Sequence, residues 1–419
     1  MANSLLTISL ITKKALALYR NSNSFVKNID KQYQSEFGRQ NYAIGDTLQI
    51  RKPVDYTVRT GPTAVPQNSN EQQITLTVNT YLGVDTQFTS QDRALSIENF
   101  ADRFLAPMIN NLGGGTAAAI MAGIETGGTG GLGGVPNIVN NTSSGINNGT
   151  AATISPTAQS FLAAGAYLDS VSCPREGRVV IMSPFTQANT VASFTGLFNP
   201  QRKISDQYET GLMGVDTLGF EKFLTDQTTI THQTAAYGAL PTVNGANQSG
   251  SAITVSALAA PLNLGDIIQF TGVTLANRTT KADAGVLATF VITQPAAIGA
   301  TVLNIYPPLI APIAGVSQQY QTVMASPANT AQVLSPVAAG QIYRKNFAFH
   351  PTSVTAVWVD LPVDMPGTFS HREQLDGMSM RMVNYYAGTS DVDSWRLDTL
   401  FGSLWPRPEW ACVVADIAT

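Results

Sequence analysis

The spacing of hydrophobic residues predicts two short helices near the start of the chain. Apolar positions recur there every three or four residues, and charged residues lie opposite them in the second helix. The apolar faces comprise Ala15, Leu16 and Tyr19 in the first helix and Phe25, Ile29 and Tyr33 in the second. Helices this short are marginally stable alone, so we expect them to dock onto another subunit.

Residues 44–90 change to the period of two that is typical of strands. Leu48 and Ile50 alternate with polar residues, and the same alternation returns around Leu76. The long polar segment between these strands contains Gly61 and Pro62 but no helical pattern. Such a segment inside a compact domain usually has a function or projects from the surface. We interpret it as an extended β-arm that reaches a neighbour, and the alternative is a disordered surface loop.

The strongest helical pattern follows Ser96. Its apolar stripe comprises Ile97, Phe100, Phe104, Met108, Ile109 and Leu112. Pro107 predicts a kink or a break, and the Gly113–Gly115 run predicts an end or an interruption before helix resumes. Residues 127–150 are rich in Gly, Asn, Ser and Thr and predict a loop.

An α+β pattern follows this loop. Ser155-Pro156 is a helix start, with a capping residue before a proline, and Cys173-Pro174 is a helix end. The apolar side of this helix comprises Phe161, Leu162 and Leu168. A short buried strand is expected at 178–183. From 228 to 340 charge almost vanishes, and apolar runs alternate with turn residues, which predicts an inserted antiparallel sandwich or barrel. The apolar C-terminal segment is expected to be buried.

The chain is poor in charge: only 12% of its residues are charged, about half the usual share. A surface covered by neighbouring subunits would explain this, although secreted β-proteins are also poor in charge. The net charge of -4 argues against avid binding of nucleic acid. The sequence contains neither a secretion signal nor a run of about 18 apolar residues. We therefore expect a cytoplasmic protein without a transmembrane helix.

No catalytic or metal-binding pattern emerges from the reactive residues. His232, His350 and His371 lack metal-ligand spacing, and no dense carboxylate cluster accompanies them in the sequence. Cys173 and Cys412 are expected to be buried free thiols. The Gly-rich stretch 127–134 lacks the Gly-Lys-Ser/Thr of a phosphate-binding loop, which favours a flexible or tightly turning loop. We expect no enzyme activity, no cofactor and no metal site.

The predicted arm carries the charged residues of most interest. They are Arg51, Lys52, Asp55, Arg59 and Glu71, and they lie in a segment with little to bury. Charges at an arm tip can pair with a neighbour and fix the register between subunits. We treat these five as candidates for inter-subunit contact, and the alternative is a solvated loop that needs charge to stay soluble.

Five collinear runs resemble the coat proteins of short-tailed phages, relatives of the coat protein encoded by gene five of a Salmonella phage. They include IGDTLQIRKPVDYTVRTG at 44–61, FAFHPTSVTAVWVDLP at 347–362 and DGMSMRMVNYYAGTS from 376, together with runs at 11–37 and 71–112. The resemblance implies the α+β HK97-like capsid fold. It implies an N-terminal arm (1–43), an extended loop (44–95), a spine helix from 96 to 125 with peripheral and axial parts to 227, an inserted β-barrel (228–340) and a second axial and peripheral part (341–419).

By the same resemblance, the chain is a major capsid protein of the virion that assembles in the host cytoplasm. Its implied partners are other copies of itself in hexamers and pentamers, a scaffolding protein, a portal, packaged double-stranded DNA and a decoration protein, but no membrane. Two rivals remain at this point. An encapsulin-like cellular shell would share the fold but lack DNA, portal and barrel. A secreted β-rich hydrolase would need clustered acids or a nucleophile–base pair.

Overall fold

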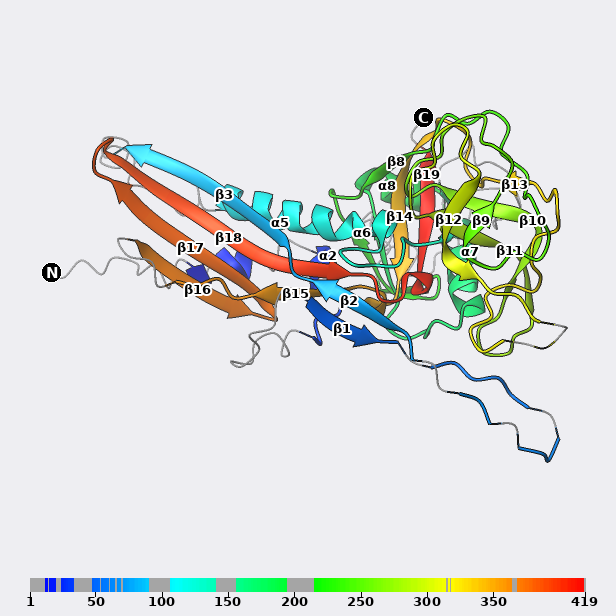
Figure 1. Ribbon diagram of the computed structural model, residues 1–419. Helices are drawn as coiled ribbons and strands as arrows, with labels where there is room; N and C mark the ends of the chain where they lie inside the picture. The colour runs from blue at the N-terminus through cyan, green and yellow to red at the C-terminus, as the bar shows by residue number, and fades with distance from the viewer. Residues whose placement is uncertain are drawn as a thin grey trace. The chain divides into compact units, whose positions relative to one another are not determined.

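A computed structural model describes residues 12–13, 15–19, 24–33, 47–52, 54–59, 61–64, 66–68, 71–89, 106–140, 156–193, 215–313, 316, 318–363 and 368–417. The described α-helices all lie before residue 193 and are mixed with strands, and strands predominate from Val215 onward, which confirms the α+β class. The chain divides into two compact units, each built from three separate stretches of sequence (Figure 1). The first unit comprises residues 1–48, 75–121 and 355–404, and the second comprises the remainder.

A long antiparallel sheet forms the frame of the first unit. Its strands are β15 (Thr355–Val359), β18 (Val392–Leu404), β17 (Met378–Ala387) and β16 (Phe369–Leu375) in that order, and β3 (Thr80–Thr89) also pairs with β18. Asp398 on β18 is fully buried but accepts hydrogen bonds from Arg381 and Arg396 at 2.7 and 2.6 Å. The neighbouring strand leaves room for this carboxylate, because a Cβ at Gly83 would lie 2.8 Å from Asp398 Oδ1. Pairing makes the buried charge tolerable.

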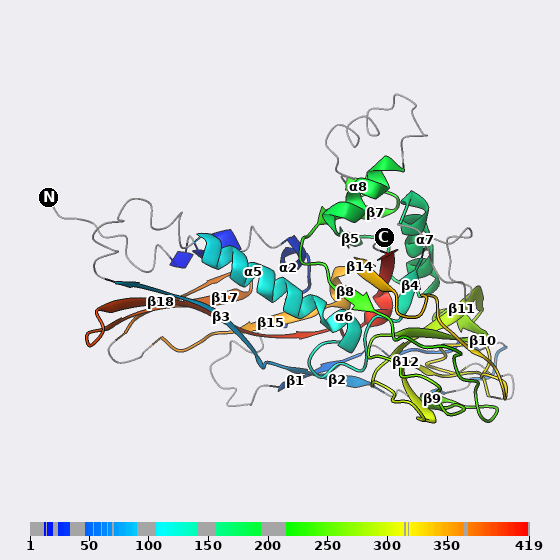
Figure 2. The ribbon, with the colours of Figure 1, turned by 90° about the horizontal axis from the view of Figure 1, so that it is seen from above.

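Helix α5 (Ala106–Met121) lies alongside this sheet, next to β3 (Figure 2). It continues through Gly113–Gly115, so the predicted interruption is wrong. Each glycine costs about 1 kcal/mol relative to alanine, and the helix tolerates this cost because Ile109, Leu112 and Ile120 bury its apolar face. Pro107 lies in the first described turn, and the expected stripe from Ser96 to Phe104 lies outside the described residues.

The apolar face of the first predicted helix packs within its own chain. Ala15, Leu16 and Tyr19 are fully buried or nearly so, which confirms their apolar face. The Tyr19 hydroxyl donates a hydrogen bond of 2.9 Å to Thr116 Oγ1 on α5. The second predicted helix shortens to α2 (Ser24–Lys27). Apolar surface nearby in the same chain therefore stabilises these short segments.

A seven-stranded mixed sheet forms one part of the second unit. Its strands follow the order β4 (Asn137–Val139), β19 (Ala411–Ile417), β14 (Ile342–Phe349), β5 (Val179–Met182), β7 (Phe220–Thr225) and β6 (Val215–Thr217), with β8 (Thr231–Gln233) also paired to β14. The fully buried β5 confirms the strand expected at 178–183, and the buried β19 confirms the buried C-terminal segment. β4 corrects the prediction that 127–150 is entirely loop: flanking prolines and asparagines hide a three-residue strand.

Helices cover this sheet. α7 (Ala158–Ser170) begins after its cap Thr157 and not at Ser155-Pro156, and it ends before Cys173. Its Phe161 and Leu168 join a core with residues of β4, β5 and β19, whereas Leu162 is exposed. α8 (Pro184–Ala192) follows β5, with Ser183 accepting a hydrogen bond from Thr186 N as its cap. α6 (Gly123–Thr126) is a single turn.

The Gly-rich stretch after α6 is a tight turn. Gly127 has a φ of +84°, and a Cβ at Gly131 would lie 2.3 Å from the Gly127 oxygen. A Cβ at Gly133 would meet the Tyr306 side chain at 2.4 Å. Only glycine allows such close approach, so the tightly turning alternative is confirmed. Cys173 and Cys412 are buried free thiols, as predicted.

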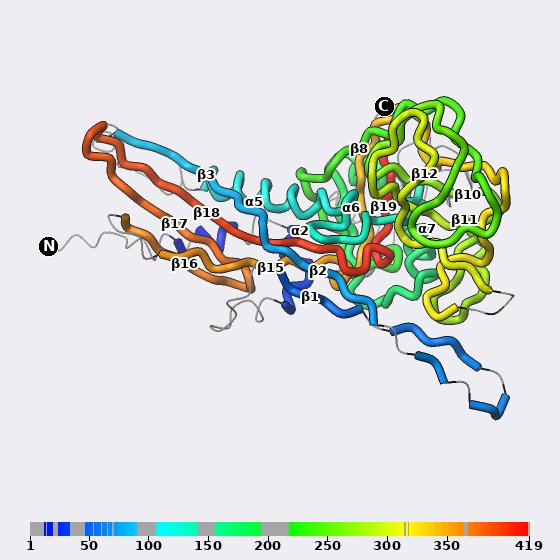
Figure 3. The backbone as a smooth tube through the Cα atoms, in the orientation of Figure 1, coloured from blue at the N-terminus to red at the C-terminus, as the bar shows by residue number. Residues whose placement is uncertain are grey.

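Five antiparallel strands form another part of the second unit, seen on the right of Figure 3. They are β9 (Gly250–Thr254), β10 (Ile267–Ala276), β11 (Asp283–Ile292), β12 (Val302–Leu309) and β13 (Val333–Leu334), in the sheet order β13-β10-β11-β12-β9. The segment 242–243 bridges both edges, because Thr242 pairs with Gln332 and Val243 pairs with Val255. The sheet therefore closes into a barrel around Phe270 and Phe290, and closure removes its free edges.

Strands β1 (Thr47–Arg51) and β2 (Gln73–Thr77) make a two-stranded sheet of their own. Ile50, Ile74 and Leu76 are buried, which confirms the alternating pattern seen in the sequence. Among the described residues, no helix is both long enough and apolar enough to cross a membrane.

Candidate inter-subunit site

The segment between β1 and β2 carries the charged residues predicted to contact a neighbour. In Figure 1 its two sides run side by side away from the ends of the strands. The side chain of Gln67 holds them together: Thr57 N donates to Gln67 Oε1 at 2.8 Å, and Gln67 Nε2 donates to the Thr57 oxygen at 2.6 Å. A side-chain amide thus links the two sides beyond the backbone hydrogen bond of 2.7 Å from Lys52 N to the Gln72 oxygen.

Arg51 and Glu71 face each other at the start of this segment. Their charged groups lie 3.3 Å apart, and their side chains are 76% and 53% exposed. Exposed pairs of this kind contribute about 0 to 1 kcal/mol. This pair is consequently available to exchange its partner for one on another molecule at little cost.

Lys52 and Asp55 point instead into their own unit. Asp55 Oδ2 accepts a hydrogen bond of 2.7 Å from Arg278 Nε, and Arg278 Nη1 donates to Glu409 Oε1 at 2.9 Å. Lys52 is buried, with Nζ 3.4 Å from the Tyr306 hydroxyl, which itself donates to Glu409 at 3.3 Å. We call these five residues the base cluster. It joins the segment to the β10–β11 turn, to β12 and to the C-terminal stretch.

The charges of the base cluster balance, with two cations and two carboxylates. Burial by itself would raise the pKa of the Glu409 carboxyl, but Lys52 and Arg278 outweigh this effect and hold that pKa below its ordinary value. Burial lowers the pKa of Lys52. The cluster is thus an internal ion network, and its geometry depends on each member keeping its partner.

The far end of the segment, which we call the tip, is exposed. Val58 is 93% exposed and Tyr56 is 55% exposed. Arg59 is also exposed and donates to the backbone oxygen of Gly61. The tip thus presents both apolar surface and a positive charge to solvent.

The structure therefore divides the five predicted residues into three groups. Arg51 and Glu71 pair with each other, Lys52 and Asp55 belong to the base cluster, and Arg59 lies at the tip. Sequence reasoning missed Arg278, Tyr306 and Glu409, which lie more than 200 residues further along the chain. A charged residue in the nearly charge-free stretch 228–340, such as Arg278, was the one available signal.

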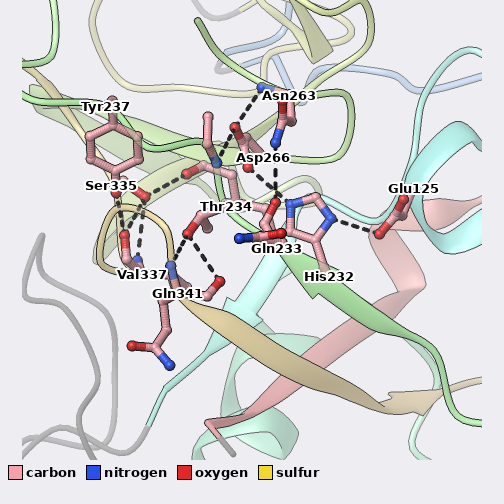
Figure 4. Close-up of polar contacts among 12 residues, drawn as sticks. Glu125, His232, Gln233, Thr234, Tyr237, Asn263, Asp266, Ser335, Val337 and Gln341 are labelled. Carbon is pink, nitrogen blue, oxygen red and sulfur yellow. Dashed lines mark hydrogen bonds and ion pairs between the residues drawn. The ribbon is translucent and has the colours of Figure 1, made fainter. Parts of the chain in front are cut away.

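A second polar site in the same unit surrounds His232 (Figure 4). Its Nδ1 lies 2.7 Å from Glu125 Oε1, and its Nε2 lies 2.9 Å from Asp266 Oδ1. Lys345 Nζ also contacts Glu125 Oε1, at 3.0 Å. We call these four residues the His232 centre. The two carboxylate partners of His232 could not be seen in the sequence, because Glu125 lies 107 residues before it and Asp266 lies 34 residues after it.

The geometry of the His232 centre requires a charged imidazolium. Both ring nitrogens face carboxylate oxygens, so both carry a proton to donate. Burial lowers the pKa of His232, but the hydrogen bonds to Asp266 and Glu125 outweigh it and raise that pKa above 6.5. Burial opposes ionisation of Glu125, yet His232 and Lys345 lower its pKa to about 2. The centre joins α6, β8, β14 and the residues before β10 by paired charges.

The His232 centre is a structural ion network. Across the described parts of the chain, no group of three or more His, Cys, Asp or Glu side chains has the arrangement of a metal site. His350 contacts the neighbouring Thr352, and His371 contacts Glu373 two residues away. Each described histidine thus has a local polar partner.

Comparisons with known proteins identify one family. The model of the P22 coat protein (gene protein 5) family matches residues 1–414. No protein of curated function matches the sequence significantly. Similar solved structures include the capsid of Ralstonia phage GP4 (9% identity, 90% of this chain and 84% of that chain, TM-score 0.44). Others are the capsid of cyanophage P-SCSP1u (14%, 90% and 85%, 0.43) and a chain of Mycobacterium phage Che8 (11%, 94% and 90%, 0.43).

Proposed function

Because the chain belongs to the P22 coat protein family, we propose that its copies form the hexamers and pentamers of a shell around double-stranded DNA. A member of this family is a major capsid protein, and it self-assembles into the icosahedral shell of a tailed phage virion. The observation that carries this conclusion is the family match over residues 1–414. The helix, sheet and barrel elements described above are consistent with the HK97-like fold.

The finer partners belong to the proposal. They are a scaffolding protein and a portal during assembly in the host cytoplasm, packaged DNA that is enclosed without being gripped, and a decoration protein on the finished particle. The net charge of -4 supports enclosure over gripping, because tight binding of a phosphate backbone needs an excess of basic residues. The role is purely structural and needs no catalysis.

We further propose that the tip of the segment between β1 and β2 contacts a neighbouring subunit. The exposed apolar surface of Val58 and the charge of Arg59 support this, as does the exchangeable Arg51–Glu71 pair. Lys52 and Asp55, which are engaged in the base cluster, hold the segment in place and do not themselves reach the neighbour. This narrows the five sequence candidates to three contact residues and two positioning residues.

Electron microscopy tests the function. Particles are purified from cells that express the full chain alone and from cells that also contain the phage genome and its packaging proteins. We expect closed particles, which contain DNA when the genome and its packaging proteins are present. Particles filled with a host enzyme would favour an encapsulin-like compartment, and the absence of any particle would contradict shell formation altogether.

The tip is tested by Val58→Asp. A charge at a buried apolar contact is costly, so we expect shell yield to fall about tenfold or more, while the circular dichroism spectrum of the unassembled chain stays unchanged. Val58→Ile keeps the apolar surface and is the matched control. Normal shells from Val58→Asp would show that the tip remains exposed in the particle.

A further inference from the structure

The base cluster connects the projecting segment to the barrel through two contacts: Lys52 lies against Tyr306 of β12, and Asp55 binds Arg278 of the β10–β11 turn. Arg278 Nε binds Asp55 of the segment, and Arg278 Nη1 binds Glu409 of the C-terminal stretch. All three side chains are less than one third exposed. A planar guanidinium with donors in fixed directions sets the relative position of the two carboxylates. The position of Arg278 therefore helps to set the direction in which the segment extends.

Arg278 stands on an ordered turn between β10 and β11. Asn277 Oδ1 accepts hydrogen bonds of 3.0 Å from the backbone nitrogens of Thr279 and Thr280. The turn closes with a hydrogen bond of 2.8 Å from Asn277 N to the Ala282 oxygen. A side-chain cap of this kind fixes a turn locally, so the guanidinium starts from a defined backbone position.

The same turn is attached to the mixed sheet side of the unit through α7. Asn277 Nδ2 donates to the Ser170 oxygen at 3.1 Å, and Thr279 Oγ1 donates to Ser172 Oγ at 2.9 Å. Both the barrel and the C-terminal end of α7 therefore determine the position of Arg278. By contrast, the Arg51–Glu71 pair on the projecting segment joins two residues of that segment's own base.

We propose that Arg278 is a positioning residue for shell assembly: it lets the barrel set the direction of the segment between β1 and β2. This inference rests on the proposed contact between the tip and a neighbour. The inserted barrel then has a defined mechanical role inside the subunit. A segment released from Arg278 samples more directions, and fewer of them match the neighbour.

The specific test removes the link between Asp55 and Arg278 and leaves the rest of the base cluster in place. Asp55→Asn keeps the shape of the side chain but loses its charge, while the contact between Arg278 and Glu409 remains. Arg278→Met removes both links. Glu71→Gln is the matched control for hydrogen exchange only, because it removes one carboxylate from the same segment at the exposed pair, but Glu71 is itself a proposed contact residue in the shell. Amide hydrogen exchange is measured on the unassembled full chain, and particles are then sized by electron microscopy.

We expect exchange of residues 54–59 to become about tenfold faster in Asp55→Asn and in Arg278→Met. Exchange in β10 and β11 should stay unchanged, as should all exchange in Glu71→Gln. The double variant should be no faster than Arg278→Met alone, because both changes break one interaction. Shells of the two variants should be fewer and uneven in size.

Exchange of 54–59 within about twofold of wild type would overturn the proposal, and so would faster exchange with normal shells. If the unaltered chain forms no shells, the proposed function fails by itself. The exchange measurement still decides in that case whether Arg278 orders the segment.

Discussion

The His232 centre and the tip of the segment between β1 and β2 use charged and polar groups in opposite ways. At the His232 centre, four ionisable side chains from distant parts of one unit satisfy each other and are mostly hidden from water. At the tip, Arg59 and Val58 face solvent. The inward arrangement holds distant parts of the unit together, and the outward one presents the surface that we propose contacts another copy. Stability and assembly should therefore respond to different residues.

His232→Ala should have the largest effect on stability. Removing the imidazolium leaves Glu125 and Asp266 buried without their shared partner, which typically costs about 3 to 5 kcal/mol. Urea unfolding followed by tryptophan fluorescence measures the loss in free energy of unfolding. His371→Ala, at a more exposed histidine, is the control and should cost less than about 1 kcal/mol. Equal losses in the two variants would contradict the distinction drawn here.

The pH dependence of stability gives a smaller effect of predictable sign. The pKa of His232 is raised above 6.5 in the folded chain, so its contribution is complete below pH 6.5 and is lost as pH rises through the folded pKa. The pKa of Glu125 is lowered from 4.5 to about 2, so its contribution is complete above pH 4.5 and is lost as pH falls toward 2. Both contributions are complete together only between pH 4.5 and 6.5.

Unfolding free energies of wild type and His232→Gln, measured from about pH 5 to about pH 9, check this prediction. The difference between the two proteins should be largest at the acidic end and should shrink as pH rises through the folded pKa of His232. A difference that stays constant or grows with pH would show that His232 is neutral in the folded chain.

Arg51→Ala should have the smallest effect on the isolated chain. Its pair with Glu71 is solvated, so the free energy of unfolding should change by no more than about 0.5 kcal/mol. If a neighbour engages this pair, dissociation of assembled shells in urea should shift measurably. A large loss of stability in the unassembled chain would show that Arg51 stabilises the fold, as the residues of the His232 centre do.

Local patterns predicted the elements of the fold well where the chain's own periodicity decides the structure. The alternation around Ile50 and Leu76 predicted β1 and β2, and the apolar face of Leu16 and Tyr19 predicted a buried helix. Predictions failed where tertiary packing overrides a local preference. Glycines at 113–115 continue a helix, and the short strand Asn137–Val139 is stabilised by pairing with β19.

The polar sites could be predicted only in part, because their members meet through the fold. Arg51, Lys52, Asp55, Arg59 and Glu71 were found from their place in one long polar segment. Arg278 and Glu409, which decide what Asp55 does, have no sequence relation to that segment. His232 likewise meets Asp266 34 residues later and Glu125 107 residues earlier.

The pairing of β3 with β18 has a consequence for the order in which the chain is completed. Thr89 pairs with Val392 and Thr80 with Phe401, so β3 leaves the ribosome long before its partner exists. At about 5 to 20 residues per second, that wait lasts on the order of 15 to 60 s. The barrel strands, which all lie between Gly250 and Leu334, have no such delay. During this interval the unpaired β3 can pair with strands of other newly made chains. The first unit is therefore the part of the subunit most exposed to misassembly while many copies are synthesised together.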